Sequence, residues 1–127
     1  MKEFLLALGV GTLASVGVAE AKPLDQYRWT ARPIVVFADS ALDPRVRQQL
    51  DMLEARAAEL EERDVVIIVD TEEGSALREE LRPRDFMFVL IGKDGEVKYR
   101  KPDPVSVREI IRLIDRMPLR LQEMGRS

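Results

Sequence analysis

Three uninterrupted apolar runs limit the folds that this chain can adopt. They are residues 34–38 (IVVFA), 65–69 (VVIIV) and 86–91 (FMFVLI). The first run is rich in β-branched side chains without polar alternation, which is typical of a central, parallel strand covered on both faces. A stretch of helical periodicity separates the first two runs, so together they predict a βαβ unit with a right-handed crossover. The chain is therefore expected to be an α/β protein with a buried sheet.

The residues between these strands predict two helices. Asp43 suits the N-cap and Pro44 the first position of a helix that we expect to reach about Glu62. Its apolar residues recur at intervals of four and three, which places them in one buried stripe. The stripe comprises Val46, Leu50, Leu53, Ala57 and Leu60. A second, shorter helix is expected over residues 75–81 and stops near Pro83.

The third strand is expected to continue into a hairpin and a last helix. Residues 93–95 (KDG) are a turn signal, and residues 96–100 alternate like an antiparallel edge strand. Ser106 and Glu109 have the spacing of a capping box, and Pro118 stops or bends the helix that follows. The predicted order is β-α-β-α-β-β-α around a central mixed sheet.

The first 21 residues predict export. Lys2 gives a short basic start, residues 4–18 carry no charge, and residues 19–21 (AEA) have the small-x-small pattern of a cleavage site. A membrane span needs roughly 20 apolar residues, so this shorter stretch favours a secretory signal over an anchor. We divide the chain into a secretory signal peptide, 1–21, and a single domain, 22–127, that is periplasmic or secreted. The alternative is a retained N-terminal helix, packed on the domain or held in the membrane.

Two missing residue types exclude much chemistry. The 127 residues include no cysteine and no histidine, so thiol oxidoreductase or peroxidase activity and Ser-His or Cys-His nucleophile pairs are excluded. The usual zinc, haem and iron–sulfur ligands are missing too. A net charge of −3, from 20 Lys+Arg against 23 Asp+Glu, argues against nucleic-acid binding. We expect no metal, no cofactor, and no membrane contact after signal cleavage.

The residues that follow the first strand are the first candidate ligand-binding site. Functional groups in open α/β sheets gather at the carboxyl ends of the strands, where Asp39, Ser40 and Asp43 lie beside a helix N-terminus. A hydroxyl and two carboxylates suit a polar ligand or a hard cation, and Asp70 and Glu72 would enlarge such a cation site. The spacing is not that of a dedicated calcium loop, and helix capping explains the residues almost as well as a ligand site does.

Two arginines extend this candidate site. Arg82 and Arg84 flank the proline before the third strand, and in the expected fold they approach the loop after the first strand. Paired guanidinium groups there would bind a phosphate, sulfate or carboxylate. The alternative is an ion pair with Asp39, Asp43 or Asp85.

Two further groups of side chains are each open to two interpretations. Arg112, Arg116 and Arg120 would line one helix face if the last helix continues past its proline, either as a contact for a partner or as a solvated stripe. Tyr27 and Trp29 belong to an extended lead-in, where edge packing is favoured over a binding cage.

The predicted order of elements is the core order of the thioredoxin fold. Residues 83–86 (PRDF) resemble the P-x-x-F segment that begins the third strand of many thioredoxin-like and peroxiredoxin-like proteins. That resemblance implies a cis Pro83 facing the active loop, whereas an ordinary helix stop is the alternative.

A narrower resemblance covers roughly residues 24–124. The stretches that carry it are 27–29 (YRW), 32–38 (RPIVVFA), 43–45 (DPR), 49–50 (QL), 85–98 (DFMFVLIGKDGEVK) and 114–120 (IDRMPLR). They resemble the bacterial domain of unknown function 4174, the prokaryotic branch of the thioredoxin-like DUDES proteins. IGKDG and DxMPxR are the most specific parts. The resemblance implies a thioredoxin-like fold and an exported protein, with no established activity. Family members have been likened to peroxiredoxins, but the active loop here, residues 39–43, has no cysteine.

Two classes of function remain open. The favoured hypothesis is a non-catalytic binding or interaction module whose partner is a periplasmic or extracellular protein or a small anionic ligand. The alternative is a non-thiol enzyme that works through carboxylate and arginine groups around Asp39, Ser40, Asp43 and Arg84. A third hypothesis is an accessory subunit of a redox partner that supplies the thiols.

Overall fold

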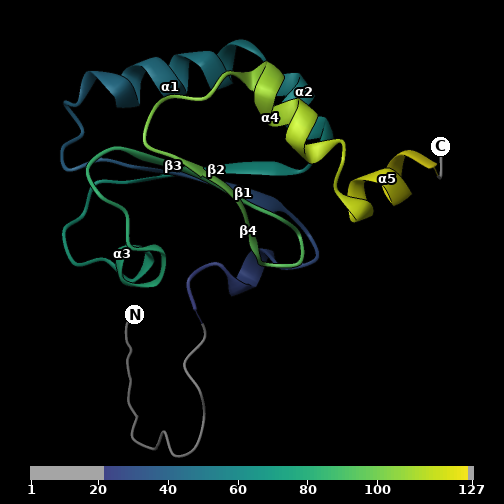
Figure 1. Cartoon of the computed structure of the whole chain (residues 1–127), viewed down its shortest axis with the longest axis horizontal. Coiled ribbons are helices and arrows are strands. Elements are labelled where there is room, and N and C mark those ends of the chain that lie inside the picture. The colour runs from purple at the N-terminus through teal and green to yellow at the C-terminus, as the bar shows by residue number, and fades with distance from the viewer. Residues whose placement is uncertain (1–21, 126–127) are drawn as a thin grey trace, which may run out of the picture.

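Figure 1 shows the computed structural model of the chain, which describes residues 22–125. The predicted signal peptide, residues 1–21, lies outside the described residues, as do residues 126–127. Within residues 22–125, no helix is both long enough and apolar enough to cross a membrane.

A four-stranded mixed sheet forms the centre of the fold, in the order β2-β1-β3-β4. Strands β1 (Arg32–Phe37) and β2 (Val65–Asp70) are parallel, as the βαβ prediction requires. Strand β3 (Met87–Ile91) is antiparallel to β1 and to β4 (Val97–Lys101). Because β1 lies between two neighbours and every one of its residues is buried, the predicted central strand is confirmed.

Three helices cover one face of this sheet: α1 (Pro44–Ala55), α2 (Ala57–Glu62) and α4 (Val107–Ile114) (Figure 1). Alternate residues of β1 and β3 point to this face and pack on the helices in one core cluster. The cluster includes Ile34, Val36, Leu53, Phe88, Leu90, Ile110 and Ile114.

The opposite face carries the short helix α3 (Ala76–Leu81) and a 3₁₀ turn, Asp25–Tyr27 (Figure 1). The intervening residues of β1 and β3 form a second cluster there. That cluster includes Leu24, Val35, Phe37, Leu81, Val89 and Ile91. The last helix, α5 (Pro118–Gly125), lies beside the layers at one end of the sheet (Figure 1).

Two predicted helices differ in detail from the structure. The long helix breaks at Arg56, whose backbone leaves helical geometry, so Ala57 is exposed while Leu53 and Leu60 both reach the core. Pro118 begins α5 rather than continuing α4, as its missing N–H favours. Within residues 22–125 every peptide bond is trans, so the implied cis Pro83 is wrong and the helix-stop alternative holds.

The second apolar run forms an edge strand. Ile67 and Val69 each keep 43% exposure, because β2 has a neighbour on one side only. An apolar run predicts a strand but does not distinguish a centre from an edge.

Candidate functional site

The loop that follows β1 holds three of the predicted site residues. Asp43 caps α1 by accepting a hydrogen bond from the backbone N–H of Arg45 at 2.9 Å, and its carboxylate contacts the Arg45 guanidinium at 2.6 Å. These hydrogen bonds lower the pKa of Asp43. Ser40 Oγ accepts a hydrogen bond from the backbone N–H of Leu42 at 3.0 Å. Both Asp43 and Ser40 therefore hold the local backbone.

Asp39 faces Arg78 of α3, a residue that the sequence pattern did not single out. Its Oδ1 lies 3.6 Å from Nη1 of Arg78. Arg78 also donates a hydrogen bond to the carbonyl of Ala38, approaches Asp70 Oδ1 at 3.7 Å, and lies over the ring of Phe37. Arg78 thus joins the ends of β1 and β2 to α3, a tertiary contact that has no local sequence signal.

Asp70 and Glu72, the suggested extension towards a cation site, hold the next loop together. Asp70 accepts hydrogen bonds from Ser75 Oγ at 2.7 Å and from the backbone N–H of Glu72 at 2.9 Å. Among residues 22–125, no group of three or more His, Cys, Asp or Glu side chains is arranged to hold a metal ion. A hollow of about 420 Å³ at this end is lined by Asp39, Thr71, Glu73 and Arg78.

The two candidate arginines do not take part in these contacts. The side chains of Arg82 and Arg84 make no hydrogen bond or ion pair with other described side chains. Arg45 provides the link instead: it contacts Asp85 at 3.0 Å and lies over the ring of Phe86. The structure therefore brings the two predicted loops together through Arg45 and Asp85.

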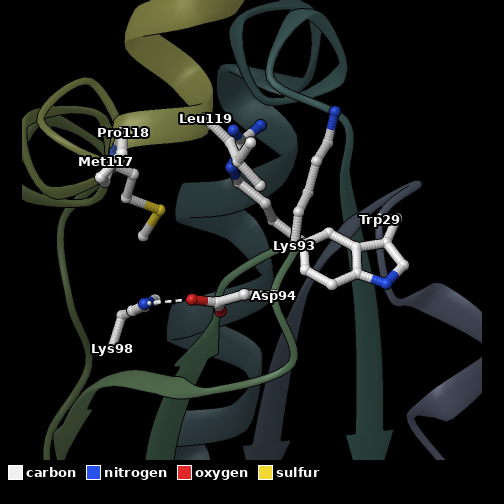
Figure 2. A pocket seen from close by; sticks show the side chains of 8 residues that line it. Trp29, Lys93, Asp94, Lys98, Met117, Pro118 and Leu119 are labelled. Carbon is white, nitrogen blue, oxygen red and sulfur yellow. Dashed lines mark hydrogen bonds and ion pairs between the residues drawn. The ribbon is translucent and has the colours of Figure 1, made fainter.

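A second hollow lies at the opposite end of the sheet, and we call it the Trp29 pocket (Figure 2). Its volume is about 200 Å³. The β3–β4 turn contributes Lys93 and Asp94, and the start of α5 contributes Pro118 and Leu119. In Figure 2, Trp29 and Met117 lie on opposite sides of it. Among these residues only Trp29 was considered for a binding site, as the less favoured alternative to edge packing.

Trp29 has an unusual backbone and an unusual exposure. Its φ of 71° lies in the left-handed region, which is strained for a bulky aromatic residue. The backbone N–H of Trp29 donates a hydrogen bond to the carbonyl of Lys93 at 2.6 Å, which ties the turn to the hairpin. The side chain keeps 64% exposure, so the predicted edge packing of Trp29 is wrong. Tyr27, in contrast, packs against the second core cluster.

A network of charged residues, from fully buried to half-exposed, lies beneath the Trp29 pocket. Arg32, the first residue of β1, is fully buried and donates hydrogen bonds to the Arg63 carbonyl at 2.8 Å and to the Glu123 carboxylate at 3.2 and 3.3 Å. Lys93 contacts Glu123 at 2.7 Å and Asp64 at 2.8 Å. Burial opposes the ionisation of Glu123, but the hydrogen bonds from Lys93 and Arg32 outweigh it and lower its pKa to about 2.

The predicted arginine stripe does not form, because Arg120 belongs to the same network. It is only 6% exposed and contacts Asp115 at 3.2 Å and Glu62 at 3.3 Å, while Arg112 and Arg116 are exposed. The start of a new helix at Pro118 turns Arg120 inward. Together these ion pairs fasten α5 to the end of the sheet.

The two stretches most specific to the family resemblance both meet at this end of the sheet. Lys93 and Asp94 of IGKDG line the pocket, and so do Met117 and Pro118 of DxMPxR. A model of the family described as "Domain of unknown function" 4174 matches residues 23–123. The chain belongs to this family. The resemblance inferred from the sequence is confirmed.

Solved structures show which fold the family member has. The chain is similar to the reduced 2-Cys peroxiredoxin of Plasmodium vivax, with 16% identity, 82% of this chain and 85% of that chain covered, and a TM-score of 0.58. It is also similar to thioredoxin peroxidase I of Plasmodium yoelii, with 18% identity, 82% and 80% covered, and a TM-score of 0.52. The thioredoxin-like α/β fold is thereby confirmed. The likeness stops at the fold, since this chain has no cysteine.

Proposed function

We propose that this chain is a non-catalytic binding module built on a thioredoxin-like scaffold. One observation carries the proposal: the loop after β1 is occupied by contacts within the chain. Arg45 engages Asp43 and Asp85, Arg78 engages Asp39, and Ser40 holds its own turn. These side chains hold the loop in place, and the chain has no cysteine thiol that would act as a nucleophile instead.

A non-thiol enzyme is the second candidate, because of the hollow beside Asp39 and Arg78. A carboxylate and a guanidinium that line the same hollow are able to orient a polar substrate. This alternative places catalysis at the carboxyl end of β1, whereas the binding module needs no ligand there. The accessory-subunit hypothesis stays a prediction, and copurification with a cysteine-bearing protein would test it.

Thermal unfolding with a panel of small ligands separates the module from the enzyme. The panel contains phosphate and sulfate esters, dicarboxylates, sugars, calcium, magnesium and manganese. A ligand at about 100 times its Kd adds roughly 2.7 kcal/mol, or a rise in Tm on the order of 10 °C. We expect no rise that depends on the loop after β1.

Two variants show whether an observed rise in Tm depends on the loop after β1. Asp39→Ala removes the exposed carboxylate that faces Arg78, and Asp51→Ala removes an exposed carboxylate on α1 as the matched control. If Asp39→Ala abolishes the rise in Tm and Asp51→Ala preserves it, the binding-module hypothesis is wrong and the enzyme hypothesis takes its place.

We also propose that the domain is exported. The short basic start, the uncharged stretch and the AEA pattern of residues 19–21 support this proposal. Expression in a Gram-negative bacterium with a C-terminal tag is expected to give a periplasmic protein that begins at Lys22, as intact-mass measurement would check. An unprocessed protein in the membrane or cytoplasmic fraction would instead support the retained helix.

A further inference from the structure

We propose that the Trp29 pocket binds a carboxylate group that carries an apolar body of about one ring. The proposal deepens the proposed function, since it gives the binding module a ligand class and a site. It rests on three features of the pocket: an exposed aromatic side chain, a lysine with a donor to spare, and N–H groups that lack acceptors.

The apolar part of the pocket suits a ring. Trp29, Met117 and Leu119 line it, and its volume of about 200 Å³ lies below the 300–1,000 Å³ range of sites for drug-sized ligands. A single aromatic or branched aliphatic group is therefore the appropriate size. Trp29 is held in a strained backbone conformation yet left 64% exposed, which is unexpected for a side chain that serves packing. Strain of this kind clusters at ligand-binding sites.

One cationic group of the pocket is open to an anion. Arg32, Lys93 and Lys98 line the pocket, but Arg32 is paired with Glu123, and Lys93 is paired with Glu123 and Asp64, so Lys98 is the cation that remains. The Asp94 carboxylate is already engaged, because it contacts Lys98 Nζ at 2.8 Å and accepts a hydrogen bond from the backbone N–H of Glu96 at 3.0 Å. Glu96 Oε1 lies 3.6 Å from Lys98 Nζ, beyond hydrogen-bond distance, so the ammonium group, which has three N–H donors, is able to donate to a second carboxylate.

Unpaired N–H donors point to the same conclusion. The Nε of Arg32 has no hydrogen-bond partner among the described residues, although the side chain is fully buried. The start of α5 lies beside it, and the first helical bond there is donated by Leu121 to the Met117 carbonyl. The backbone N–H groups of Leu119 and Arg120 consequently have no acceptor within residues 22–125. A carboxylate at this helix N-terminus would supply acceptors and favourable charge.

Two sources share this chemistry. One is a free arylalkanoate, and the other is the C-terminal residue of a protein, whose carboxylate and apolar side chain present the same groups. We choose 3-phenylpropionate and a tetrapeptide that ends in phenylalanine as probes. Each has a control of the same shape without the charge, 3-phenylpropionamide and the peptide C-terminal amide.

The chain contains a single tryptophan, so intrinsic fluorescence reports on this pocket alone. We expect saturable changes in Trp29 emission with at least one acid, and affinity about tenfold or more above that of the matching amide. Tighter binding of the free acid than of the peptide would identify a small metabolite as the ligand, and the reverse would identify a protein C-terminus. Equal affinity of acid and amide, or no change in emission up to about 10 mM acid, would overturn the proposal.

Variants separate binding from folding. Asparagine tolerates the left-handed region, so Trp29→Asn is expected to keep the Tm of the parent chain while calorimetry shows at least about tenfold weaker binding of the acid. Leu121→Asn removes another exposed apolar side chain at this end of the sheet and is expected to leave binding of the acid unchanged. Unchanged binding by Trp29→Asn would contradict the assignment of the site.

The charge of Lys98 is tested separately. Lys98→Gln is expected to reduce the preference for acid over amide, and Lys101→Gln, further along β4, is expected to preserve it.

The same samples distinguish this proposal from the proposed function. If NMR spectra reveal conversion of the bound acid to a product, the non-catalytic module is wrong while the pocket assignment stands. If the acid binds but Asp39→Ala abolishes binding and Trp29→Asn does not, the ligand sits at the other end of the sheet and the Trp29 assignment is wrong.

Discussion

Replacing Gln49 with leucine is expected to lower the free energy of unfolding by about 3 kcal/mol. Gln49 lies on α1 and is fully buried. Its Nε2 donates a hydrogen bond to the Val105 carbonyl at 2.9 Å, and its Oε1 accepts one from the Val105 backbone N–H at 2.8 Å. Leucine fills the same space but leaves both backbone groups of the buried Val105 without partners. Urea denaturation at neutral pH measures the change.

The neighbouring glutamine supplies the control. Gln48 is exposed on the same helix, so Gln48→Leu is expected to change stability by no more than about 0.5 kcal/mol. A loss below about 1 kcal/mol for Gln49→Leu would show that the loop before α4 relaxes and finds water, contrary to the expectation.

Glu123→Ala is expected to cost about 3 kcal/mol, because it leaves the fully buried charge of Arg32 without its carboxylate partner. We take the lower end of the range for buried ion pairs, since the Glu123 side chain retains 24% exposure. Urea denaturation again measures the loss, and Gln122→Ala, an exposed change on the same helix, is the control. Equal stability of the two variants would mean that the ion pairs of Glu123 contribute nothing to the stability of the fold.

The pKa of Glu123 gives this prediction a pH dependence. The folded-state pKa is lowered from 4.5 to about 2, so the ionised carboxylate stabilises the fold fully above pH 4.5. That contribution is lost as the pH falls from 4.5 towards 2. The stability difference between the parent chain and Glu123→Gln is therefore expected to shrink across this interval. A difference that stays constant there would contradict the role of the charge.

Local patterns explain what could be predicted from the sequence. Asp43 and Ser106 cap helices as expected, since a cap depends on residues within one turn. Gly95 adopts a φ of 86° in the predicted hairpin turn for the same reason. The apolar run of β1 fits a central strand, since burial on both faces leaves no polar position, but the similar run of β2 forms an edge strand.

The pocket and its network escaped prediction because their partners are distant in sequence. Arg32 and Glu123 are 91 residues apart, and no spacing rule connects them. Arg120 was assigned to an exposed stripe because the pattern assumed one continuous helix, whereas a new helix starts at Pro118. Periodicity describes which residues share a face, but it does not reveal which face a reoriented helix turns inward.

The composition of the Trp29 pocket sets the order in which the fold is completed during synthesis. Its walls come from the turn before β1, the β3–β4 hairpin and the start of α5, so the segments to be joined are separated by most of the domain. The chain emerges from the ribosome with its N-terminal end first. Contacts between segments this far apart in sequence form late, because the intervening loop must close first. The sheet can pair once β4 has been made, but the pocket requires Pro118 and Leu119. The pocket is thus the last part of the fold to be completed, and we expect a chain that terminates before α5 to form the sheet without the pocket.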